Sequence, residues 1–241
     1  MKKRILSILL LCCMVLTMLP TTVLAADGPM DTIPKYDVSI DVYNRTSDIS
    51  IKDSRSYYIY SSVPDKLRDT WAWDKKIFIK GDKTAPHVFI DGVNIEMSPS
   101  SKGPAIELNK KASAYIYFIG KNSSLQGADG RAAIQKNRSE GQLYVLARTG
   151  TTVTCKGGDK AAGIGGSYAT RNISNGYYNG DMYGHGVNMH FGSQSNPDYW
   201  GGTIAAIGGR NGAGIGAGRG GAGEKLYFYS GKIEAKGGEA A

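Results

Sequence analysis

A glycine followed at fourteen residues by an isoleucine that lies among small residues occurs four times in this 241-residue chain. Each glycine follows an apolar run, and each isoleucine lies among small residues. The pairs are Gly92 and Ile106, Gly120 and Ile134, Gly150 and Ile164, and Gly201 and Ile215. Successive isoleucines are 28, 30 and 51 residues apart, so the last interval is one period plus a segment of about 23 residues. A constant period in this range indicates a repeat architecture.

Each repeat contains short runs of alternating apolar residues separated by glycine-rich corners. Strands are expected before the glycines, at 88–90, 115–119, 143–146 and 226–229, and after them, at 93–95, 152–154, 203–205 and 233–235. One such unit cannot bury its apolar side chains alone, whereas units stacked at about 4.8 Å pair each strand with its counterpart. The pattern predicts an all-β parallel solenoid with about 28 residues per coil, in which the four isoleucines point inward and form a column. A β-sandwich remains the rival, since short strands with turn signals also suit it.

Glycine is concentrated where the corners are expected: 25 of the 33 glycines lie from Gly150 onward. Collagen is excluded because the glycines have no three-residue period. No stretch between the strands has the length and periodicity of a helix, which argues against a βαβ sheet.

The N-terminus has the pattern of a secretory signal peptide. Lys2, Lys3 and Arg4 precede an apolar stretch at 5–19, and small or β-branched residues lead to an expected cleavage after Ala25. The alternative is a retained signal anchor, but the run is short for a membrane span. Cleavage removes three basic residues from the net charge of +8, leaving +5, and leaves Cys155 as the single cysteine. The mature chain then forms no internal disulfide, and its charge is too low and dispersed to predict a nucleic-acid partner.

Three further regions follow from the repeat. Residues 26–76 are expected to form an N-terminal cap and the first imperfect coils, and residues 77–241 the regular solenoid. Residues 167–200 are expected to be an insertion, rich in aromatic and polar residues. Since the chain ends midway through a coil, we expect a longer array to continue beyond Ala241.

Two segments resemble a known repeat. Residues 161–166 (AAGIGG) and 212–217 (GAGIGA) are similar to the GAGIGG repeats of secreted and surface proteins from Gram-positive gut bacteria. Residues 87–95 resemble the opening coil of such arrays, and the likeness extends from about Ile77 to the C-terminus. These proteins are often described as containing carbohydrate-binding domains. The resemblance implies a right-handed parallel β-helix at the cell surface or outside the cell, and it assigns no binding residues.

Other motifs have simpler explanations. The glycines of 212–220 are not flanked by a strand and a helix as a dinucleotide fingerprint requires. His185 and His190 have no third ligand at a metal-binding spacing. The acidic residues at the expected corners do not recur as the pair that glycoside hydrolysis needs. The sequence therefore predicts no catalytic residues, metal or cofactor.

The aromatic residues of the expected insertion are the best binding candidates. Tyrosine and tryptophan rings stack on sugar rings, while neighbouring polar groups bond hydroxyls. The candidates are Tyr177, Tyr178, Tyr183, Tyr199 and Trp200. Alternatively, these rings pack against the solenoid wall as a small core of their own. We expect a non-catalytic glycan-binding or adhesion module, with a polysaccharide-degrading β-helix enzyme or a purely structural stalk as alternatives.

Overall fold

The computed structural model describes residues 34–239, apart from residues 102, 110, 138–139 and 169–183. The signal peptide and Tyr177, Tyr178 and Tyr183 therefore lie outside the described residues. Within the described part, the secondary structure consists of β-strands and two short 3₁₀ helices, η1 (Asp65–Leu67) and η2 (Pro99–Ser101). No helix in this part is long and apolar enough to span a bilayer.

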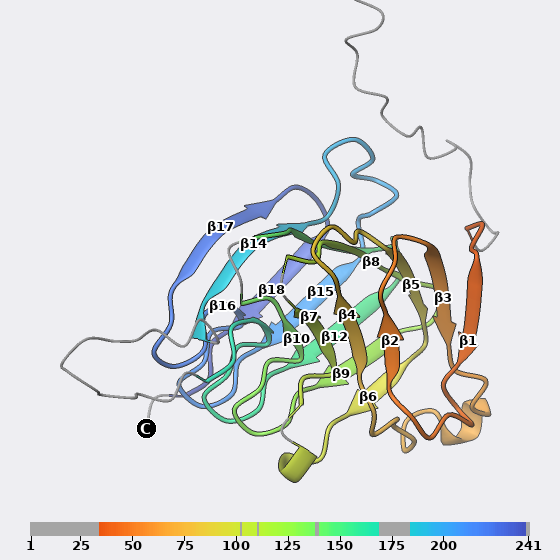
Figure 1. Cartoon of the computed structure of the whole chain (residues 1–241), viewed down its shortest axis with the longest axis horizontal. Helices are drawn as coiled ribbons and strands as arrows, with labels where there is room; N and C mark the ends of the chain where they lie inside the picture. Colours follow the sequence, from red (N-terminus) through yellow and green to blue (C-terminus); the bar gives the residue numbers. More distant parts are fainter. Residues whose placement is uncertain (1–33, 102, 110, 138–139, 169–183, 240–241) are drawn as a thin grey trace, which may run out of the picture. The chain divides into compact units, whose positions relative to one another are not determined.

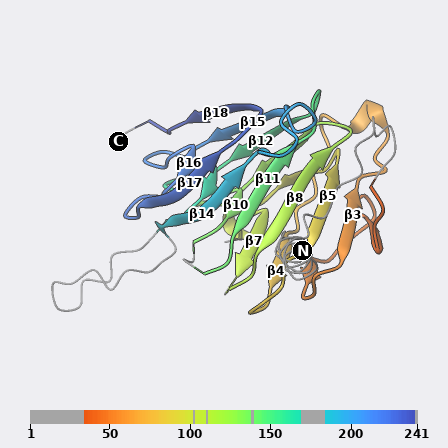
Figure 2. The same ribbon diagram turned by 90° about the horizontal axis from the view of Figure 1, so that it is seen from above.

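The strands of the described residues form three parallel sheets (Figures 1 and 2). The seven-stranded sheet contains β1 (Val38–Asp41), β3 (Ser56–Tyr60), β5 (His87–Asp91), β8 (Ala114–Ile119), β11 (Leu143–Ala147), β14 (Gly186–Phe191) and β17 (Gly223–Phe228). The six-stranded sheet contains β2 (Ile49–Ile51), β4 (Ile77–Lys80), β7 (Ile106–Asn109), β10 (Ile134–Gln135), β13 (Ile164–Gly165) and β16 (Ile215–Gly216). The five-stranded sheet contains β6 (Asn94–Glu96), β9 (Ser123–Gln126), β12 (Thr152–Lys156), β15 (Thr203–Ile207) and β18 (Lys232–Lys236).

Successive strands in each sheet come from successive repeats, as expected for a β-solenoid. The chain passes from one sheet to the next and then adds a parallel strand to the first (Figure 2). The alternative prediction of a β-sandwich is therefore wrong. The three parallel sheets are compatible with a β-helix.

The isoleucine column is confirmed and is longer than the sequence indicated. Ile106, Ile134, Ile164 and Ile215 are paired one after another across β7, β10, β13 and β16. Ile49 and Ile77 extend the column on its N-terminal side. Because residues in register on neighbouring strands point to the same face of the sheet, one inward position repeats through six strands.

A positive φ explains the glycine after each of the two later isoleucines, and at Gly165 close approach of the next repeat adds to it. Gly165 and Gly216 pair in register and have φ values of 129° and 123°. A Cβ atom added to Gly165 would lie 2.1 Å from the carbonyl oxygen of Gly216. A larger residue would therefore collide with the next backbone and would also have to adopt a strained conformation.

The turn after each long strand is where the sequence prediction needs correction. Gly92, Gly120 and Gly150 have φ values of 61°, 65° and 84°, as a left-handed turn requires. Gly201, however, does not close a strand. Gly192, with φ of 76°, directly follows β14, and a loop at 193–202 separates it from β15.

The segment 167–200 is consequently not a single insertion outside the repeat. It contains β14, which pairs with β11 on one side and β17 on the other. This strand (GVNMHF) is not followed by a glycine and an isoleucine at the usual spacing, because the loop at 193–202 lengthens the chain after it. The extra residues are thus divided between the segment before β14 and the loop after it.

Two tryptophans lie at the N-terminal end of the sheets. Trp73 is 3% exposed, pairs with Ile95 beside β6, and donates its indole N–H to the Arg45 carbonyl oxygen at 2.7 Å. Trp71 packs against the core and makes an edge contact with Tyr43. These contacts cover apolar side chains of the first strands.

Candidate functional site

The outer face of the seven-stranded sheet carries aromatic residues at alternate strand positions. The inward residues of these strands, such as Ile90 and Phe118, are fully buried. The outward residues between them form two aromatic groups. One is a column of stacked rings that crosses five strands, and the other is a cluster beside it.

The ring column results from the parallel register. Residues in register on β5, β8, β11, β14 and β17 are His87, Tyr115, Tyr144, His190 and Tyr227. Their successive ring centroids are 4.7, 4.4, 4.4 and 4.7 Å apart, with interplanar angles of 5° to 16°. Parallel pairing places equivalent side chains one strand spacing apart, which is close to the preferred distance for stacked rings.

This stacking limits what the column can bind. A sugar packs its C–H groups against the face of an aromatic ring, but both faces of Tyr115, Tyr144 and His190 are covered by neighbouring rings. A gap of 4.4 Å between centroids leaves no room for a pyranose. The middle of the column can therefore offer a ligand only ring edges and hydroxyl groups.

The outer aromatic cluster has a different geometry. Tyr58, Phe89 and Ile119 are buried within it, and three partly exposed rings pack against them: Tyr60, Tyr117 and Trp200. Phe89 stacks on Tyr117 at 4.8 Å, and Trp200 lies 5.0 Å from Tyr117 at an angle of 41°. Because Trp200 is tilted and half-buried, part of its ring packs on the cluster and part is exposed to solvent.

Trp200 reaches the cluster from the loop at 193–202. The backbone N–H of Thr149 donates to the Tyr199 carbonyl oxygen at 2.9 Å, and the Thr149 hydroxyl donates to the Asp198 carbonyl oxygen. Tyr199 lies edge-on to Trp200, with centroids 4.8 Å apart. The loop is thereby held against the turn after β11, and Trp200 is positioned next to Tyr117.

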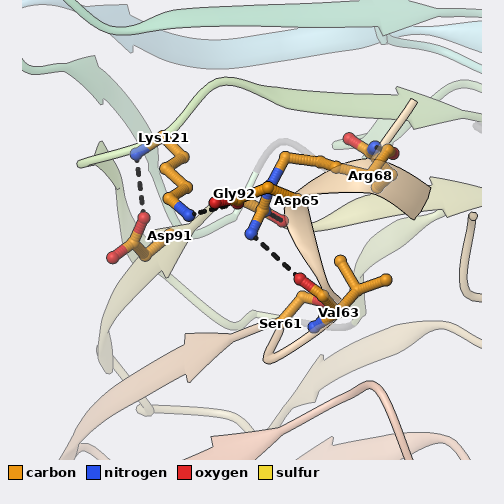
Figure 3. Close-up of polar contacts among 8 residues, drawn as sticks. Ser61, Val63, Asp65, Arg68, Asp91, Gly92 and Lys121 are labelled. Atoms are coloured by element: carbon orange, nitrogen blue, oxygen red, sulfur yellow. Dashed lines mark hydrogen bonds and ion pairs between the residues drawn. The ribbon is translucent and has the colours of Figure 1, made fainter.

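A charged rim borders the cluster on the side of Asp91 (Figure 3). The Asp91 carboxylate accepts hydrogen bonds from the Tyr58 hydroxyl at 2.9 Å and from the Lys121 backbone N–H at 2.8 Å. The Lys121 ammonium lies 2.7 Å from Asp65. Arg68 donates to the Gly92 carbonyl oxygen at 3.0 Å, which connects the segment around η1 to the turn after β5.

The protonation states in this region follow from these contacts. The hydrogen bond from Lys121 lowers the pKa of Asp65 below its ordinary value. Burial raises the pKa of Tyr58 and of Tyr117 well above that of a free tyrosine. Around neutral pH these two tyrosines are therefore neutral phenols, and the Asp65 carboxyl group is ionised.

The structure brings together two of the five residues proposed from sequence. Tyr199 and Trp200 are in contact at the outer aromatic cluster, where Trp200 packs on the sheet. Sequence analysis did not propose Tyr58, Tyr60, Phe89 or Tyr117, although it predicted the strands that contain Phe89 and Tyr117. An available signal was the aromatic residue three positions before a turn glycine, which occurs at Phe89 and Tyr117.

Among the described residues, no group of three histidine, cysteine, aspartate or glutamate side chains is placed to hold a metal ion. Cys155 is buried in the core, and burial raises the pKa of its thiol. No protein-family model, curated protein or solved structure matches this chain.

Proposed function

We propose that this protein is an exported, non-catalytic glycan-binding or adhesion module, and that its outer aromatic cluster contacts the glycan. The observation that carries the proposal is the placement of Trp200 on Tyr117, in the same cluster as Tyr58, whose hydroxyl donates to the Asp91 carboxylate. An aromatic surface next to hydrogen-bonding groups suits a carbohydrate, which has apolar C–H faces and polar hydroxyls.

The fold assignment proposed with it is a right-handed parallel β-helix of the GAGIGG-repeat type. The paired isoleucines up to Ile164 recur every 28 to 30 residues, in support of coils of about that length. The signal-peptide pattern of residues 1–25 supports export to the cell surface or the medium.

Two carboxylates in the segments on either side of β3 are unsuited to the acid step of polysaccharide cleavage. A glycosidase needs a carboxylic acid whose pKa is raised so that it can donate a proton. Hydrogen bonds from Arg55 and then Tyr57 lower the pKa of Asp53 to about 2, and Asp65 is also shifted downward. These two groups remain ionised and are unsuited to act as general acids.

Replacing Trp200 by alanine is expected to weaken glycan binding at least tenfold, because it removes a partly exposed ring of the cluster. The measurement is a glycan array with the purified chain, followed by titration calorimetry on the glycans that bind. Trp71→Phe is the matched control, since Trp71 packs at the N-terminal end of the sheets.

The array and the stability of the variant together distinguish the alternatives. Trp200→Ala is expected to lower the unfolding free energy by about 1–2 kcal/mol, because Trp200 is only partly buried. If Trp200→Ala binds the glycan as tightly as the natural protein does, the outer aromatic cluster is not the glycan-binding surface. No binding across the array would instead favour a structural stalk, and release of reducing sugars would favour an enzyme.

A further inference from the structure

His87 connects the ring column to the outer aromatic cluster. Its Nδ1 atom lies 3.0 Å from the Tyr117 hydroxyl oxygen, and the two rings stack with centroids 5.7 Å apart at 9°. Tyr117 in turn contacts Trp200. A change at His87 therefore reaches Trp200 through one intervening side chain.

Protonation changes what His87 can do in this contact. A neutral imidazole has one donor and one acceptor nitrogen, whereas the imidazolium has two donors and no acceptor. When Nδ1 is protonated it can only donate, so the Tyr117 hydroxyl must accept and direct its own proton elsewhere. Protonation also places a positive charge next to the rings of Tyr115 and Tyr117, whose centroids lie 4.7 and 5.7 Å from that of His87.

The charged groups on the elements beside His87 are engaged with other partners. On β3, Ser56 is in register with it, and the nearby Arg55 and Asp53 are paired with each other at 2.9 Å. On β8 the facing groups are tyrosines, and on β5 itself Asp91 is engaged by Tyr58 and Lys121. Burial accordingly lowers the pKa of His87 below its ordinary value of 6.5.

The same arrangement occurs a second time in the column. His190 stacks between Tyr144 and Tyr227, and its Nδ1 atom lies 3.0 Å from the Tyr229 hydroxyl oxygen. Its Nε2 atom is buried with no hydrogen-bond partner among the residues that the structure describes, and burial lowers its pKa. In both places the histidine is bonded to the tyrosine two residues after its stacking partner, so the contact at His87 is a property of the column.

We infer that His87 makes the outer aromatic cluster sensitive to acid, because protonation of His87 repositions Tyr117 and Trp200. Its consequence, weaker glycan binding in mildly acidic surroundings, rests on the proposed function. The change at Trp200 itself does not, and it can be measured without a ligand.

The test uses the full chain labelled with 5-fluorotryptophan, whose three tryptophans give three fluorine NMR signals. Assignment is by single tryptophan-to-phenylalanine changes. Between pH 8 and 4.5, the Trp200 signal is expected to shift with a midpoint below 6.5, while the Trp71 and Trp73 signals stay constant. His87→Phe keeps a stacked ring and should abolish the shift, whereas His190→Phe should retain it.

Tyr117→Phe provides a second variant that keeps the ring and removes the hydroxyl, and it should reduce the shift. A Trp200 signal that does not change with pH, or one that still titrates in His87→Phe, would overturn the inference. If no glycan binds, the proposed function fails while the titration still decides the role of His87.

Discussion

Changing Ile134 to alanine is expected to lower the free energy of unfolding by about 3 kcal/mol, within the range measured for truncating a fully buried isoleucine. Ile134 is 0% exposed and is paired with Ile106 on one side and Ile164 on the other. The cavity would therefore open in the middle of the isoleucine column, where rigid backbone on both sides limits collapse. Chemical denaturation followed by circular dichroism measures the loss.

Ile207→Ala is the matched control for this prediction. Ile207 lies on β15 next to the inward-facing Ala206, so its side chain points outward and is only partly buried. We expect it to change the unfolding free energy by less than about 1 kcal/mol. Equal effects at the two positions would contradict the inward column on which the packing argument depends.

The second large effect concerns a lysine in the core. Ile51, Ile79 and Leu108 occupy one inward position on β2, β4 and β7. Lys136 takes the corresponding position after β10, is 1% exposed, and donates from Nζ to the Glu140 carbonyl oxygen at 3.0 Å. Burial lowers its pKa from the ordinary 10.5 to about 8.

The sign of the pH effect follows from that shift. Between pH 8 and 10.5 the unfolded chain binds the proton of Lys136 and the folded chain has released it, so stability rises with pH in this window. Lys136→Met removes the charge and keeps a linear side chain. Its advantage in unfolding free energy over the natural protein is expected to shrink by about 3 kcal/mol between pH 7.5 and 10.5.

Comparing the two proteins at each pH cancels the titration of the buried tyrosines, which affects both equally. Lys156→Met is the control, because Lys156 is exposed on β12, and its difference from the natural protein should not vary with pH in this way. A constant difference for Lys136→Met would show that Lys136 reaches solvent in the folded state.

Much of this architecture could be predicted from sequence because a solenoid repeats its local rules. A buried isoleucine and a glycine at a close backbone approach recur at a constant distance, so each repeat provides evidence for the next. The prediction was wrong at Gly201 and incomplete at 167–200, since the spacing there crosses a loop. Sequence distance alone does not distinguish a loop placed before a strand from one placed after it.

The candidate site was less predictable. Trp200 could be proposed as an aromatic residue suited to sugars, but its partners Tyr58, Phe89 and Tyr117 lie 83 or more residues away in the chain. Strand alternation shows that these rings point outward, without showing which rings come together.

The chain's sequence was sufficient to predict stacked parallel strands and an isoleucine column, because the inward positions depend on local alternation and a fixed period. Only the tertiary structure showed that the outward rings stack face to face, that Trp200 folds onto Tyr117, and that Lys136 occupies an apolar position. Those features depend on the register between strands and on the path of a loop. Both are determined by contacts between distant segments.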